Sequence, residues 1–388
     1  MTITAPKGFR ASGVTAGLKA SGNPDLALVV NDGPSKAAAA VFTSNRVAAA
    51  PVHWSRQVVS DGRVDAVILN SGGANACTGP QGFQNTHTTA EKTAEALGLS
   101  ATDVFVCSTG LIGEQLPMDK IVPGIDAAAA ALSADGGPDA ATAIMTTDTV
   151  SKQAVFTGAD ADGNEFTIGG IAKGAGMLAP GLATMLVVLT TDADVQPELL
   201  DLALRDATRV TFDRADSDGC MSTNDTVVLL ASGASKAVPS DGTFAQGLTQ
   251  VCAELARKLI GDAEGASHDI AIRTFNAATE RDAETVSRAV ARSNLFKAAI
   301  FGKDPNWGRV LSAVGTTDAA FEADQLNVSM NGIQICQNGG IGQDRMLVDL
   351  EPREVLVEID LQAGGAEATI WTNDLTHDYV HENSAYSS

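Results

Sequence analysis

Residues 173–192 read KGAGMLAPGLATMLVVLTTD, and this stretch sets a glycine-rich loop directly before a strand pattern. It opens with Lys173, turns through glycines and Pro180, and from Met185 becomes an almost unbroken apolar run. Such a run is typical of a strand that is buried on both faces. Thr184 stands at the junction of loop and strand, and a small hydroxyl residue there needs a reason in packing or in chemistry.

The rest of the chain alternates between strand and helix patterns. Short apolar or alternating runs predict strands within 26–32, 37–44, 64–77, 104–113, 225–233, 268–275, 354–361 and 367–372. Helical periodicity predicts helices at 85–97, 124–133, 138–146, 197–212, 243–260, 282–292 and 306–313. The Asp162-Gly163 pair indicates a hairpin. We expect interleaved parts of one α/β body rather than separate domains on a linker.

Composition narrows the class of protein. With 44% hydrophobic and 19% charged residues among 388, the chain is expected to be globular. A formal net charge of −21 disfavours binding to nucleic acid or to anionic lipid. The chain has no apolar run of membrane-spanning length and no leader-like N-terminus, so we expect a cytoplasmic protein without a membrane segment. Five scattered cysteines without a CxxC pair indicate reduced thiols, and the five histidines show no triad or metal-ligand spacing.

The glycine-rich loop itself allows two interpretations. Residues 174–179 fit a relaxed GxGxxA nucleotide fingerprint, but a helix has to follow that motif, and here Pro180, Gly181 and strand-forming residues follow. A nucleotide site is therefore disfavoured. What stays open is a simple tight entry into a strand, in which Thr184 is structural, or a loop that presents Thr184 for chemistry.

The chemical interpretation depends on cutting the chain. A threonine at a new N-terminus carries its own base, because an α-amino group has a pKa of about 7.7–8.0 and is partly neutral near pH 7. Thr184 is internal, so this amine forms only if the Ala183–Thr184 bond is broken. The threonine hydroxyl can break that bond by attacking the preceding carbonyl, and the glycines around it permit the strained backbone that this step needs.

Seven further segments have no obvious use in a generic α/β protein: NSGGANACTG (70–79), CSTGLIGEQLPMDK (107–120), AIMTTDT (143–149), STNDTV (222–227), DAEGAS (262–267), FGKDPNWGRV (301–310) and ENSAYSS (382–388). Together with residues 173–193, they resemble, in the same order, the signatures of the ornithine acetyltransferase (glutamate N-acetyltransferase) family of arginine biosynthesis. The resemblance spans essentially the whole chain.

The resemblance implies an α/β fold in which two β-sheets are sandwiched between helices. It also implies self-cleavage into an α fragment, residues 1–183, and a β fragment, residues 184–388, whose elements interleave. Two copies of each fragment would form a heterotetramer.

The resemblance also assigns site residues. Thr184 matches the nucleophile that follows the cleavage position at Ala183, and Thr109 and Gly110 match the oxyanion hole. A hydroxyl beside a backbone N–H can direct two donors at a tetrahedral oxyanion. The expected substrate contacts are Thr184 itself, either Thr146 or Thr147, Lys173, Glu264, Asn383 and Ser388. A cation at Lys173 would also lower the pKa of the Thr184 amine. Taken alone, these residues allow ordinary readings as turn, helix-end, surface and tail residues.

The implied reaction moves an acetyl group from N2-acetyl-L-ornithine to L-glutamate through an acetyl ester on Thr184. It needs no metal and no organic cofactor, and some members of the family also accept acetyl-CoA. Three alternatives stay open: a self-processing amidase or aminopeptidase, a clavulanate-type relative with the same reaction, and a binding protein on an inactivated scaffold. The last would be expected to lack Thr184 or the oxyanion donors, and both are present.

Overall fold

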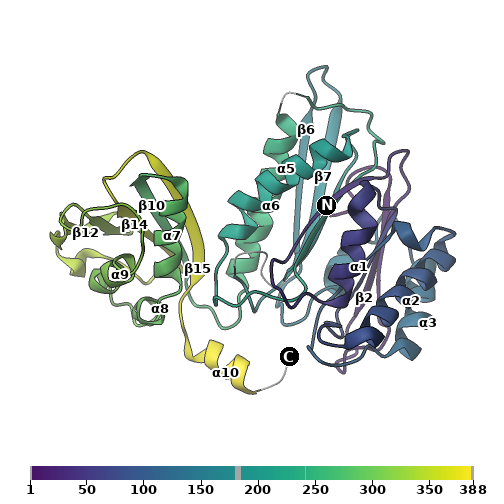
Figure 1. The fold of residues 1–388 in the computed structure, drawn as a ribbon, viewed down its shortest axis with the longest axis horizontal. Coiled ribbons are helices and arrows are strands. Elements are labelled where there is room, and N and C mark those ends of the chain that lie inside the picture. Colours follow the sequence, from purple (N-terminus) through teal and green to yellow (C-terminus); the bar gives the residue numbers. More distant parts are fainter. Residues whose placement is uncertain (1, 180–184, 241, 386–388) are drawn as a thin grey trace.

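The computed structural model describes residues 2–179, 185–240 and 242–385. Their main body is a sandwich of two β-sheets between two helical layers (Figure 1). Several strands at its centre, such as β2 (Leu26–Asn31) and β8 (Leu186–Thr191), are buried at every residue. Their unbroken apolar sequences follow from this position, because one face meets helices and the other meets the opposite sheet. The expected α/β sandwich is confirmed.

The first sheet has four strands in the order β1-β2-β4-β5. Besides β2, these are β1 (Phe9–Val14), β4 (Ala66–Asn70) and β5 (Val104–Ser108). Two helices, α2 (Gly79–Leu97) and α3 (Met118–Ala130), pack on its outer face. The edge strands are accompanied by α1 (Ala50–Val58) beside β5 and α4 (Gly137–Ala143) beside β1.

The second sheet has the order β3-β9-β8-β7-β6 and mixes strands from both halves of the chain. Its other strands are β3 (Ala37–Phe42), β6 (Lys152–Ala159), β7 (Glu165–Lys173) and β9 (Thr226–Ala231). The β6–β7 pair is the expected hairpin, with Gly163 at a φ of 83° in the turn. On the outer face lie α5 (Pro197–Val210) and α6 (Thr243–Gly261).

A second unit with its own hydrophobic core follows the sandwich. Its six-stranded sheet has the order β13-β12-β11-β14-β10-β15. The strands are β10 (Asp269–Ala277), β11 (Asn327–Met330), β12 (Ile333–Gln337), β13 (Gly340–Ile341), β14 (Glu354–Asp360) and β15 (Ala366–Asn373). With them pack α7 (Glu280–Ala291), α8 (Asn294–Phe301) and α9 (Trp307–Val314). This separate core differs from the single body expected from the sequence, because strand periodicity does not reveal which strands share a sheet.

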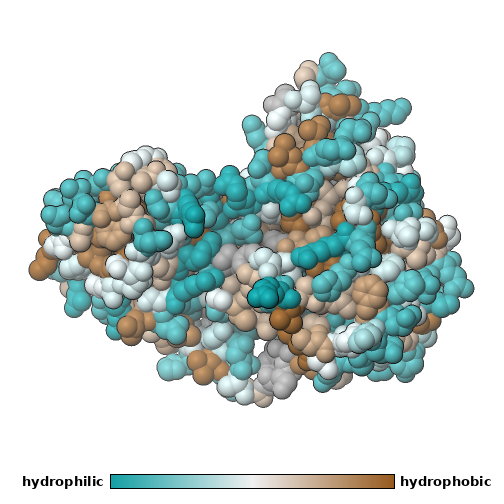
Figure 2. Space-filling view, in the orientation of Figure 1, coloured by the Kyte–Doolittle hydropathy of each residue, from teal (hydrophilic) through white to brown (hydrophobic). Residues whose placement is uncertain are grey.

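The chain then leaves the second unit and returns to the sandwich through α10 (His377–Ala385) (Figure 1). On the face shown in Figure 2, hydrophilic side chains cover much of both units and apolar ones form separated patches. Within the described ranges, no helix is both long and apolar enough to cross a membrane.

Candidate active site

The two sheets of the sandwich bring distant segments together at one end. Thr109 follows the last residue of β5 in the first sheet, and Lys173 is the last residue of β7 in the second. The Lys173 Nζ atom donates a hydrogen bond of 3.3 Å to Thr109 Oγ1. Both side chains are buried, Thr109 at 2% exposure and Lys173 at 1%. The expected oxyanion donor and the expected substrate lysine are therefore in direct contact.

A cavity of about 600 Å³ opens at this point. Its lining contains every expected site residue that the structure describes: Thr109, Gly110, Thr146, Thr147, Lys173, Glu264 and Asn383. Both Thr146 and Thr147 face it, so the structure does not choose between them. Ala183, Thr184 and Ser388 lie outside the described residues. The volume falls in the range typical of sites for small molecules.

The turn after β5 is arranged to offer donors. The Thr109 N–H donates a hydrogen bond to the Asn70 carbonyl at 2.9 Å, and the Thr109 carbonyl accepts one from the Gly73 N–H at 3.0 Å. Because the Lys173 ammonium donates to Thr109 Oγ1, the hydroxyl proton of Thr109 is left to point elsewhere. Gly110 has a φ of 134°, and a Cβ there would lie 2.7 Å from Gly73 N, so only glycine fits.

Asp148 is a site residue that the sequence analysis missed. Its Oδ2 accepts the Thr146 N–H at 2.9 Å, and its Oδ1 accepts the Gly174 N–H at 2.7 Å. Burial raises the pKa of Asp148, but the charges of Lys173 and Lys152 and the hydrogen bonds outweigh burial and bring the pKa to about 2. One ionised carboxylate thus fixes the loop of Thr146 against the loop that begins at Lys173.

A second carboxylate extends this connection to Glu264. Lys152 is fully buried, and its Nζ lies 2.6 Å from both Asp148 Oδ1 and Asp262 Oδ2. Glu264 N–H in turn donates to the Ala175 carbonyl at 2.9 Å. The buried group of Lys152 and two aspartates therefore joins the three loops that supply Thr146, Lys173 and Glu264. A motif signal for Asp148 existed in MTTD, but no pattern in the sequence indicates that Lys152 is buried.

Burial dominates the electrostatics of Lys173. Burial, the largest effect, and the charge of Lys152 lower the pKa of Lys173. The carboxylates of Asp148, Asp225 and Glu264 raise it. The net direction is downward. Lys173 therefore occupies a poorly solvated position, and nearby carboxylates offset part of the effect of burial on its pKa.

Glu264 and Asn383 meet at the mouth of the cavity. Asn383, on α10, donates from Nδ2 to Glu264 Oε2 at 3.0 Å. Gly176 packs against the same carboxylate, and a Cβ at Gly176 would lie 2.7 Å from Glu264 Oε2. The position of this carboxylate is thus limited by an amide on one side and by backbone on the other.

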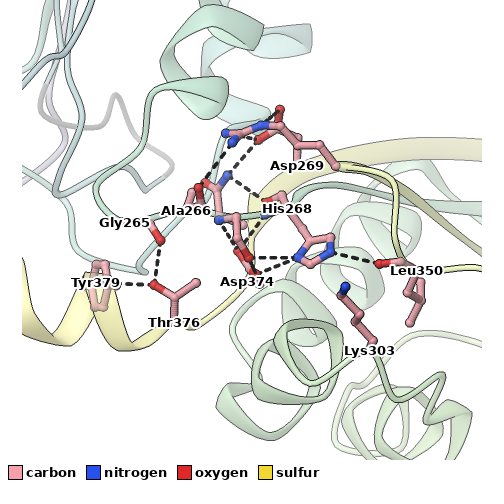
Figure 3. A network of polar contacts seen from close by, with 12 residues as sticks. Gly265, Ala266, His268, Asp269, Lys303, Leu350, Asp374, Thr376 and Tyr379 are labelled. Atoms are coloured by element: carbon pink, nitrogen blue, oxygen red, sulfur yellow. Dashed lines mark hydrogen bonds and ion pairs between the residues drawn. The ribbon is translucent and has the colours of Figure 1, made fainter.

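A polar network holds α10 in place (Figure 3). Asp374, between β15 and α10, accepts the N–H groups of Ser267 and His268, each at 2.9 Å. It also accepts the Ser267 hydroxyl and lies 2.7 Å from His268 Nδ1. Thr376 caps the network by donating to the Gly265 carbonyl at 2.6 Å. The loop that follows Glu264 is therefore fastened to the start of the helix that carries Asn383.

Asp225 is a further buried carboxylate beside the start of β8. Its Oδ1 accepts the Met185 N–H at 2.9 Å, while its Oδ2 has no hydrogen-bond partner among the described residues. Burial raises the pKa of Asp225 well above its ordinary value, although the Met185 N–H and Lys173 act against this shift. Its partner Met185 directly follows Thr184 in the sequence.

Across the described part of the chain, no group of three histidine, cysteine or carboxylate side chains is placed to hold a metal ion. The cavity instead combines hydroxyl and backbone donors, a buried lysine and a positioned glutamate.

Comparison with known proteins gives the family. The model of the ArgJ family matches residues 10–388. The chain belongs to the ArgJ family. It is 66% identical to the arginine biosynthesis bifunctional protein ArgJ of Streptomyces coelicolor over the full length of both chains. It is 54% identical to the protein of that name from Mycobacterium leprae, over all of this chain and 96% of the relative.

A solved structure completes the comparison. The ornithine acetyltransferase of Mycobacterium tuberculosis, crystallised with ornithine, is 55% identical, with a TM-score of 0.44. The match covers 48% of this chain and 96% of that chain. Membership of the ArgJ family confirms the resemblance seen in the sequence, and it makes the chain an acyltransferase of arginine biosynthesis.

Proposed function

We propose that the protein transfers an acetyl group from N2-acetyl-L-ornithine to L-glutamate through an acetyl ester on Thr184. The observation that supports this most directly is the cavity, in which the expected site residues that the structure describes come together from five separate segments of the chain. The hydrogen bond from Lys173 Nζ to Thr109 Oγ1 also supports the proposal, because it leaves the Thr109 hydroxyl proton to be donated to an oxyanion. L-Ornithine and N-acetyl-L-glutamate are the products.

The proposal includes self-cleavage between Ala183 and Thr184. The threonine hydroxyl attacks the Ala183 carbonyl, the amide becomes an ester, and water hydrolyses that ester to leave a free α-amine on Thr184. Residues 1–183 would then supply β3, β6 and β7 of the second sheet, and residues 184–388 would supply β8 and β9. Two fragments that share one hydrogen-bonded sheet would stay together, and we propose a heterotetramer of two α and two β fragments.

Acetyl transfer then follows in two half-reactions. Thr184 Oγ attacks the acetyl carbonyl of the donor while the Thr184 amine takes the hydroxyl proton. The Thr109 hydroxyl and the Gly110 N–H stabilise the oxyanion, a contribution of about 10²–10³ in rate for each donor. The C–N bond breaks, the proton passes to the departing amine of ornithine, and the ester remains.

In the second half-reaction, glutamate accepts the acetyl group by the same steps in reverse. Its α-amine attacks the ester carbonyl, the oxyanion forms again at Thr109 and Gly110, and Thr184 Oγ leaves with a proton. Lys173 keeps the Thr184 amine unprotonated by its charge, Glu264 holds the donor's side-chain amine, and Thr146 or Thr147, Asn383 and Ser388 complete the contacts. No cofactor takes part in these steps.

The relatives' name, bifunctional, favours a second acetyl donor. We include acetyl-CoA, whose thioester would acylate Thr184 in place of acetylornithine. Release of free CoA that depends on both glutamate and Thr184 would support this, and its absence would restrict the enzyme to recycling.

The test begins with denaturing mass analysis of the purified chain. Fragments of residues 1–183 and 184–388, the second beginning TMLVVL, are expected, and Thr184→Ala should remain uncut and inactive. Thr184→Ser retains a hydroxyl and an α-amine and serves as the conservative control. Acetyl transfer by an intact wild-type chain would contradict the mechanism. Water as the main acceptor in the presence of glutamate would indicate the amidase alternative.

A further inference from the structure

The cavity contains three titratable side chains among its described lining residues: Lys19, Lys173 and Glu264. Lys173 contacts Thr109 at the reacting end, and Glu264 is fixed by Asn383. Lys19 has no place in the mechanism derived so far. It arrives from the loop between β1 and β2 of the first sheet, whereas Glu264 follows α6 on the second sheet, so the two reach the cavity from different layers of the sandwich.

The loop that carries Lys19 is rigidly built. The fully buried carboxylate of Asp25 accepts three backbone N–H groups, from Ala16 at 2.6 Å, Leu18 at 2.5 Å and Lys19 at 3.0 Å. Three donors on one buried carboxylate fix the backbone up to the residue that lines the cavity. The fold therefore fixes the backbone position from which Lys19 reaches the cavity.

The ammonium group of Lys19 is only partly satisfied. Its Nζ donates to the Pro24 carbonyl at 2.7 Å, and a lysine has two further protons to donate. Within the described residues, no carboxylate forms an ion pair with Lys19, and both oxygens of Asp25 accept backbone N–H groups. Burial lowers the pKa of Lys19, Asp25 raises it and the nearby charge of Lys173 lowers it. A carboxylate entering the cavity would accept the remaining protons of the Lys19 ammonium group and would stabilise its charged form.

The proposed reaction requires this cavity to bind two amino acids whose side chains carry opposite charges. The donor ends in an ammonium group, and the acceptor, an α-amino acid of similar length, ends in a carboxylate. Glu264 suits the first and repels the second. We infer that Lys19 binds the side-chain carboxylate of the acceptor and so makes the second half-reaction selective for an acidic amino acid.

This inference rests on the proposed function and adds a specificity residue to it. The test uses the processed enzyme with Lys19→Met, which keeps an unbranched side chain without the charge. Lys120→Met is the matched control. Lys120 Nζ donates to the Gly17 carbonyl of the same loop at 2.7 Å but does not line the cavity, so its loss removes a cation and a loop contact only.

Three rates are compared in each enzyme: transfer to glutamate, transfer to glutamine, and exchange of labelled ornithine into acetylornithine. Losing a hydrogen bond to a charged group should lower kcat/KM for glutamate by about ten- to a hundredfold in Lys19→Met. Exchange with ornithine and transfer to glutamine should change less than about threefold, and Lys120→Met should resemble the wild type.

The ratio of the glutamate rate to the glutamine rate decides the inference, because general damage to the fold would lower both rates together. An unchanged ratio in Lys19→Met would overturn it. A wild-type enzyme that exchanges ornithine but never acetylates glutamate would overturn the proposed acceptor instead, so the two failures are distinguishable.

Discussion

Replacing Gly176 by alanine tests whether the Glu264 carboxylate has to be held in one place. A Cβ at Gly176 would lie 2.7 Å from Glu264 Oε2 and 2.8 Å from both its Cδ and Oε1, whereas ordinary contact begins near 3.4 Å. The carboxylate must therefore retreat by about 0.7 Å, against the 3.0 Å hydrogen bond from Asn383. A hydrogen bond to substrate of about 2.8 Å would lengthen to about 3.5 Å and be lost.

The magnitude follows from the charge on this group. Hydrogen bonds to charged partners contribute about 1.5–3 kcal/mol, so kcat/KM for acetylornithine should fall by about 10- to 150-fold. Most of the change should appear in KM, because the substrate amine is bound alike before and during the reaction. Steady-state kinetics with acetylornithine as the varied substrate measure both constants, after mass analysis has shown that the variant is cut as the wild type is.

Gly308→Ala is the control, because a Cβ there would lie no closer than 3.4 Å to Asn306 Oδ1 in the second unit. It should leave the kinetic constants unchanged. If Gly176→Ala also leaves KM for acetylornithine unchanged, the reasoning that Glu264 binds the substrate amine in a fixed position is refuted.

Three further predictions concern charged groups. The pKa of Asp148 is about 2 in the folded protein against an ordinary 3.8, so its ionisation contributes about 2 kcal/mol of stability above about pH 4, and this is lost as pH falls through 2. Urea unfolding of the uncut chain should therefore show a deficit for Asp148→Asn that is largest near pH 6 and shrinks towards pH 2; a deficit independent of pH would contradict the assignment. Lys173→Met should move the acidic limb of the pH–rate profile upward, because a nearby cation lowers an amine pKa, and an unchanged limb would remove this role. Asp374→Asn cannot accept every hydrogen bond that fastens α10, so KM for acetylornithine should rise with little change in kcat, and an unaltered KM would separate the network of Asp374 from substrate binding.

Local sequence predicted much of the sandwich because its central strands are continuous apolar runs. The run after Thr184 forms β8, and the Asp162-Gly163 pair forms the turn of the β6–β7 hairpin. Elements whose sequences lack a strong period were missed, including α1, α8 and the three short strands β11 to β13. Their structure depends on tertiary packing more than on local preference.

The residue types of the site were also present in the sequence, as motifs whose resemblance to one family named Thr109, Lys173 and Glu264. The sequence did not show that these residues lie close together. Thr109 and Lys173 are 64 positions apart; the first directly follows β5 of one sheet and the second ends β7 of the other, so only the packing of the two sheets brings them within hydrogen-bond distance.

The charged residues show most clearly what the sequence determines and what only the tertiary structure decides. In a chain with a net charge of −21, Asp148 and Lys152 look like an ordinary solvated pair four residues apart. The structure buries both and adds Asp262 from 110 positions away. Sequence determined which charges exist, but burial decides which of them must be paired, because an isolated charge away from water is too costly to keep.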